Sequence, residues 1–173
     1  MPTPEALAAA ELIEPLRNAI SADASPQTVL AKLSESGQDI DAIKFLAQAL
    51  GPRGSITWAF ACLREHGTAG KPERAAAIEA VERWLAEPSD ANRRAAQEAA
   101  AKVSGTPEGC LALSVFFSEG SIAPPNLQNV PPPPFLAEKI AGAGLLVAAV
   151  QQEPERAPER LQRWIQLGLQ GAA

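Results

Sequence analysis

The sequence predicts an all-α protein, and its composition and its pattern of breaks support this fold class. Alanine is the commonest residue, tyrosine is absent, and runs of β-branched residues are few. Alanine loses the least free energy of any residue on entering a helix. Proline and glycine divide the chain into segments of about 12 to 18 residues, the usual length of globular helices. We therefore expect a single domain over residues 1–173, a compact bundle of eight or nine helices with a proline-rich strap at residues 120–134.

Four helices are expected in the N-terminal half of the chain, over residues 5–20, 26–36, 39–50 and 54–66. In the first, Pro15 should kink or split the helix because it lacks a backbone N–H. Ser25 followed by Pro26 marks a capped start for the second. Gly51 and Pro52 should form a sharp turn between the third and the fourth. The fourth is apolar on two faces, so we expect it to lie at the centre of the bundle.

The C-terminal half is expected to contain five segments: helices over residues 73–86, after Ser89, over 109–118, over 135–150 and after the break at 154–158. In the helix after Ser89, alanines recur every four positions at Ala91, Ala95 and Ala99, which predicts a small-residue face that another backbone can approach. The most apolar stretch, residues 140–150, is about half the length that a bilayer-spanning helix needs. It is therefore expected to be a buried helix.

Charge argues against several classes of partner. The 15 Lys and Arg residues against 20 Asp and Glu give a formal net charge of −5, and the basic residues are scattered among acids. A nucleic-acid surface is therefore disfavoured. No basic run precedes an apolar segment at the N-terminus, as it would in a secretory signal. These features predict a cytoplasmic protein that binds neither nucleic acid nor membrane.

The candidates for chemistry are few. His66 is the only histidine, and Cys62 lies one helical turn before it, so any Cys-His arrangement would use this pair. A structural zinc site needs four ligands, and Cys110 is the only other thiol. We favour a histidine at a helix end with two reduced, buried thiols, and expect no metal and no cofactor.

Carboxylate pairs at Asp39 with Asp41, and at Glu79 with Glu82, are expected on exposed helix faces and do not indicate a hydrolase. The three tryptophans lie on apolar helical stripes and are expected in the core: Trp58, Trp84 and Trp164. The sequence therefore predicts a protein that is not an enzyme.

The strap is the one segment where a functional role competes evenly with a structural one. Six prolines interrupt residues 120–134, and residues 131–134 should adopt an extended polyproline II conformation. A rigid segment carrying Ile122, Leu127, Val130 and Phe135 could bind a protein partner with little loss of conformational freedom. It could equally cover the protein's own core. Both interpretations stay open from the sequence.

Three segments resemble an uncharacterised bacterial helical family associated with type VI secretion effector modules. They are DAIKFLAQALGPRGSITWAFACLRE (41–65), ERWLAEPSDANRRAAQEAA (82–100) and SVFFSEGSIAPPNLQNVPPPP (114–134). The family pattern has tandem tryptophans in the first of these helices and an acidic residue after the arginine. This sequence departs from it with Thr57 and Gly54 at those positions.

The resemblance implies a cytoplasmic helper, a co-chaperone that binds the chaperone of a secreted effector and regulates delivery of that effector. An immunity protein that binds and neutralises a cognate toxin is the alternative, and an acidic surface would suit a basic toxin. An enzyme or small-molecule binder would need a polar pocket, and a pocket that contains His66 would favour that class.

Overall fold

The computed structural model describes residues 8–11, 24–67 and 70–171 of the chain. These residues form α-helices and one 3₁₀ helix, with no strand among them. In chain order the elements are α3 (Pro26–Glu35), α4 (Asp39–His66), α5 (Pro72–Ala86), α6 (Asp90–Lys102), α7 (Pro107–Phe116), α8 (Leu136–Gln151), η1 (Pro154–Arg156) and α9 (Ala157–Gly171). The all-α class is confirmed.

The expected number of eight or nine helices is not reproduced, because seven α-helices are labelled within the described ranges. The expected helices over residues 39–50 and 54–66 join into the single long helix α4. The expected helix over residues 5–20, with its kink at Pro15, lies outside the described residues except for 8–11. Of these four, residues 8 and 9 are helical and a turn follows.

Helix α4 changes direction at Gly51, where the predicted turn lies. Gly51 has φ 70° and ψ 179°, a non-helical conformation inside the 28-residue helix. Only glycine adopts this region of backbone space readily. Pro52 follows at the start of the second half, where its missing N–H costs nothing. The predicted break is therefore present, but helical hydrogen bonding resumes at once on its far side.

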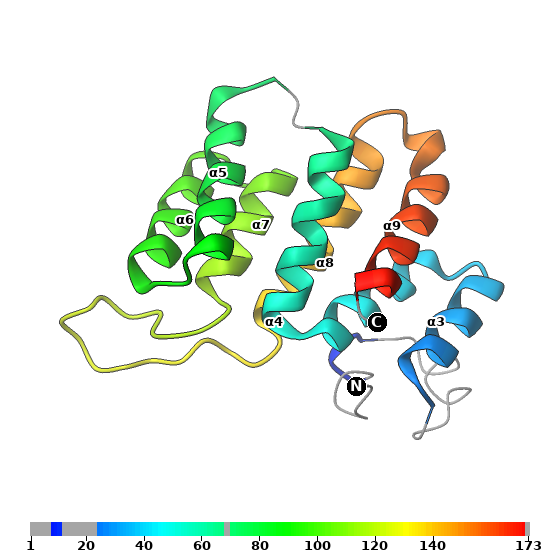
Figure 1. Cartoon of the computed structure of the whole chain (residues 1–173), viewed down its shortest axis with the longest axis horizontal. Helices are drawn as coiled ribbons and strands as arrows, with labels where there is room; N and C mark the ends of the chain where they lie inside the picture. The colour runs from blue at the N-terminus through cyan, green and yellow to red at the C-terminus, as the bar shows by residue number, and fades with distance from the viewer. Residues whose placement is uncertain (1–7, 12–23, 68–69, 172–173) are drawn as a thin grey trace.

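The core is arranged around α4, as the sequence predicts. This helix contacts α3, α5, α7, α8 and α9, and in Figure 1 it runs through the middle of the molecule with α8 behind it. The three tryptophans are buried as expected, with exposed fractions of 2–5%. The indole N–H of Trp58 on α4 donates a 2.8 Å hydrogen bond to the carbonyl of Trp164 on α9. This bond ties helices from distant parts of the chain together.

Small residues allow α8 to approach its neighbours closely. A Cβ atom added at Gly144 would lie 2.9 Å from Cβ of Cys110 on α7, and one at Gly142 would lie 3.4 Å from Cβ of Ala47 on α4. The glycines of the apolar helix therefore serve packing. None of the helices in the described ranges combines the length and the hydropathy needed to cross a membrane.

Helix α6 buries a different face from the one predicted. Its buried residues are Arg93, Ala96 and Ala100, whereas Ala91 is exposed and Ala95 and Ala99 are partly buried. Ala96 and Ala100 are also four residues apart and lie on the adjoining stripe. The spacing of the alanines alone therefore could not show which stripe is buried. The start at Ser89 is confirmed, because its side chain accepts a hydrogen bond from the backbone N–H of Asn92. A charged side chain thus occupies the buried stripe of α6.

Candidate functional site

The strap between α7 and α8 forms a loop that projects from the helical body on the side of α6 (Figure 1). Two contacts close it near its base. The N–H of Ile122 donates to the carbonyl of Val130 at 2.8 Å, and the N–H of Val130 donates to Oγ of Ser121 at 3.1 Å. A further bond of 3.0 Å, from the N–H of Leu127 to the carbonyl of Pro124, forms a turn at the tip. Residues 121–130 therefore hold a defined conformation.

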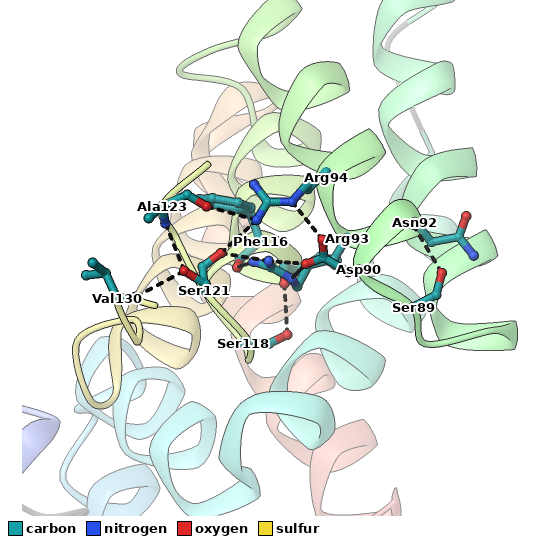
Figure 2. Close-up of polar contacts among 11 residues, drawn as sticks. Ser89, Asp90, Asn92, Arg93, Arg94, Phe116, Ser118, Ser121, Ala123 and Val130 are labelled. Carbon is teal, nitrogen blue, oxygen red and sulfur yellow. Dashed lines mark hydrogen bonds and ion pairs between the residues drawn. The ribbon is translucent and has the colours of Figure 1, made fainter. Parts of the chain in front are cut away.

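Arg93 anchors the base of this loop to α6, as Figure 2 shows. Its side chain is 1% exposed. The guanidinium donates to the carbonyl of Phe116 at 2.7 Å and to that of Ser121 at 2.8 Å, and it lies 4.8 Å from the centre of the Phe116 ring. Gly120, with φ 70°, passes so close that an added Cβ would lie 3.2 Å from this guanidinium. Because this buried guanidinium donates to backbone carbonyls on both sides of Gly120, it fixes the turn at which the strap begins.

Arg94 and Asp90 complete the anchor (Figure 2). Arg94 donates to the carbonyl of Ala123 at 2.9 Å and to that of Ser121 at 3.2 Å. Asp90 forms ion pairs with both arginines. Its hydrogen bonds to Arg93 and then to Arg94 hold the pKa of this carboxyl below its usual value. The small-residue face predicted at Ala91, Ala95 and Ala99 missed the role of Arg93; a charged residue in register with the buried alanines of α6 was the available signal.

The four residues singled out in the strap fall into two pairs. Ile122 and Phe135, near the two ends, are partly buried. Leu127 and Val130 are exposed, at 61% and 44%. These two belong to the four exposed large hydrophobic residues among the described positions. The ends of the strap thus lie partly against the protein, while its middle offers apolar side chains to solvent.

The strap ends at Phe135, which has a left-handed backbone conformation with φ 62° and serves as the N-cap of α8. This conformation is costly for a bulky residue. The N–H of Leu136 donates to the carbonyl of Pro133 at 3.3 Å across this turn. The junction is therefore a constrained corner.

His66 lies in a polar cleft of about 460 Å³ between the end of α4 and the start of α9. Its ring contacts Trp164 edge to face, with centroids 5.8 Å apart. Partial burial, and then the positive charge of Arg160, lower the pKa of His66. Uncharged imidazole is thus favoured in this cleft.

Three arginines and three glutamates surround this histidine, and each arginine is paired with a carboxylate. Arg163 pairs with Glu65, Arg156 with Glu159 at 3.2 Å and Arg160 with Glu153 at 3.3 Å. Arg160 is only 12% exposed and donates to the carbonyl of Ala149 at 2.8 Å. The charges in the cleft therefore compensate each other, and Arg160 caps the C-terminal end of α8.

Both cysteine thiols are harder to deprotonate than a free thiol. Burial, and then the charge of Glu65, raise the pKa of Cys62, so its thiol stays protonated. Cys110 is only partly buried, which corrects the prediction of two buried thiols. Burial also raises its pKa. Within residues 8–11, 24–67 and 70–171, no group of three His, Cys, Asp or Glu side chains is arranged to hold a metal ion.

Four acidic side chains are buried, and the sequence placed two of them wrongly. Asp39 and Asp41, expected on an exposed face, are only 9% and 8% exposed. Glu108 is 2% exposed and pairs with Arg74 at 2.7 Å. Glu138 is 4% exposed, and burial raises its pKa. Contacts between helices bury these positions, and no periodicity within one helix reveals such contacts.

Residues 29–172 match the model of a family of unknown function, DUF6931. The chain belongs to this family. The DUF6931 match includes the strap, its anchor on α6 and the cleft at His66, so all three lie within the family region. No curated protein and no solved structure matches the chain.

Proposed function

We propose that this DUF6931 protein is a non-catalytic, cytoplasmic binding protein that presents the strap to a protein partner. The observation that carries the proposal is the combination of a buried anchor and an exposed tip. Arg93 holds the base of the loop, while Leu127 and Val130 stay in solvent. A loop ordered before binding loses little conformational entropy when the partner docks. Exposed apolar side chains on such a loop supply the contact area.

For the partner we propose the chaperone of a type VI secretion effector, which makes this protein a co-chaperone that regulates effector delivery. The resemblance of the strap and of two helices to the secretion-associated family supports this choice. The net charge of −5 supports it less, because an acidic surface also suits a basic toxin. The identity of the partner therefore has to be measured.

The test is a pull-down with the tagged full chain from its native cells, with partners identified by mass spectrometry and the complex mass by light scattering. Three baits are compared: the wild type, the double variant Leu127→Asp/Val130→Asp, and the control Ile40→Asp/Val150→Asp. The control changes two other apolar residues of similar exposure, 54% and 53%, outside the strap. We expect the wild type and the control to recover the chaperone in fixed stoichiometry and the strap variant to lose it. All three should keep the helical circular dichroism signal at 222 nm.

Other outcomes contradict the proposal in distinguishable ways. Recovery of a toxin would favour the immunity interpretation. Loss of the partner with the control variant alone would place binding on the surface around Ile40 and Val150. Loss of helical signal in the strap variant would mean that the strap only covers the core. A protein that captures nothing would contradict both interpretations.

A small-molecule role is the second candidate, because the cleft does contain His66. Its arginines already pair with glutamates, so an anion would have to displace carboxylates. Titrating inorganic phosphate while following the His66 ring resonances tests this role. Under our proposal the resonances show no saturable shift, whereas a saturable shift would favour the small-molecule role.

A further inference from the structure

Resting on the proposed function, we infer that the partner reads residues 130–134 of the strap as a polyproline II ligand, in a groove lined by aromatic side chains. The segment is Val130 followed by four prolines. Its conformation, its exposed edges and its free carbonyl all point to this class of partner.

The conformation of the segment follows from its covalent structure. Each proline ring fixes φ near −65°. A following proline restricts ψ of the residue before it to the extended region. Residues 131–133 carry both restraints at once, and all peptide bonds in the described ranges are trans. The segment is therefore a polyproline II helix before any partner arrives.

Three residues make one turn of such a helix, so residues three apart share an edge. Pro132 lies on one edge and is partly buried. The other two edges carry Val130 with Pro133, and Pro131 with Pro134, and all four residues are exposed. The segment thus lies along the protein on one edge and offers two edges to solvent.

The exposed residues form two dipeptides that each end in proline, Val130-Pro131 and Pro133-Pro134, with Pro132 between them turned to the protein. At a rise of about 3.1 Å per residue the two dipeptides lie about 9 Å apart. Grooves that bind proline-rich segments use aromatic rings to hold such ridges. Pro132, which such a groove does not need to contact, is the residue that the protein itself covers.

Main-chain hydrogen bonds tie Val130 and Pro133 to residues before and after the segment. The carbonyls of Val130 and Pro133 are occupied by the N–H groups of Ile122 and Leu136, at 2.8 and 3.3 Å. The carbonyl of Pro131, like those of Pro132 and Pro134, accepts no hydrogen bond from a described residue. A tryptophan N–H or tyrosine O–H in the partner groove can donate to it.

The experiment uses the partner recovered by the wild-type bait and measures its affinity for three full-chain forms by calorimetry. The variant Pro131→Ala/Pro134→Ala removes two ring contacts with the groove. The control Pro132→Ala releases one backbone restraint of the same kind but removes none of those contacts. We expect the first variant to weaken binding by at least about tenfold and the control by less than about twofold. We also expect excess decaproline peptide to displace the partner.

Three results would overturn the inference. If Pro132→Ala weakens binding as much as the double variant, rigidity and not ring contact is recognised. If neither variant changes affinity, or decaproline fails to compete, while Leu127→Asp/Val130→Asp still abolishes capture, the strap binds through other chemistry and the proposed function stands. If the wild-type bait recovers no partner, the proposed function and this inference both fail. Thermal unfolding of each variant confirms that the fold is retained.

Discussion

Arg93 joins the strap to the helical body. Its side chain is 1% exposed and donates to backbone carbonyls on either side of Gly120. Arg94 reaches the same loop from a more exposed position, with 22% of its side chain in solvent. We therefore expect Arg93 to contribute more than Arg94 to the free energy of unfolding.

Replacing Arg93 with leucine is expected to lower the free energy of unfolding by about 3 kcal/mol. The buried carbonyl of Phe116 and the partly buried carbonyl of Ser121 lose a charged donor, and such bonds contribute more than neutral ones. Arg94→Leu serves as the control and should cost about 1 kcal/mol, because water can replace its donors. Urea unfolding measures both values. Equal effects of the two variants would mean that burial of Arg93 does not anchor the strap.

The burial of Glu138 predicts that its contribution to stability falls as pH rises, which is the opposite of the effect of an acid in a salt bridge. Burial raises its pKa in the folded protein, so the folded state binds this proton more tightly than the unfolded state does. Its contribution to stability is therefore present at low pH and is lost as pH rises through the folded pKa. We expect Glu138→Gln to raise the melting temperature relative to wild type more at pH 7 than at pH 4. A difference independent of pH would contradict the burial of this carboxyl.

Among the elements, α4 shows how one residue shapes a helix that spans the core. Both halves of α4 are amphipathic or apolar enough to be predicted as helices, and Gly51 with Pro52 was the predicted boundary. The sequence could not show that the second half would resume immediately after the break. That outcome depends on packing against α8 and α9, which lie far along the chain.

Substituting Gly51 with alanine is expected to destabilise the protein by about 2 kcal/mol, because its φ of 70° and ψ of 179° are strained for any residue with a Cβ. An added Cβ meets no atom within 4 Å, so the cost comes from the backbone alone. Pro52→Ala should cost less than about 1 kcal/mol, since alanine is tolerated at the start of a helical segment. Thermal unfolding compares the two. A stabilising Gly51→Ala would show that α4 has no need of its break.

At the level of the whole molecule, the sequence predicted the all-α class, the strap, the capped helix starts and the buried tryptophans. These features depend on local composition and on the spacing of apolar residues. The burial of the charged residues Asp39 and Glu108 was not predictable, because each is buried by a helix from another part of the chain. The division of the strap residues, with Leu127 exposed and Ile122 partly buried, likewise depends on how the loop folds back on itself.

The proposed function requires a partner to dock on the preformed strap. Amide hydrogen exchange of the full chain, alone and with the recovered partner, tests it most directly. Slower exchange on binding is expected at residues 126–130, which carry the amides nearest the prolines, with little change around His66. Protection confined to the His66 cleft, or to the region of Ile40 and Val150, with exchange in the strap unchanged, would contradict the account.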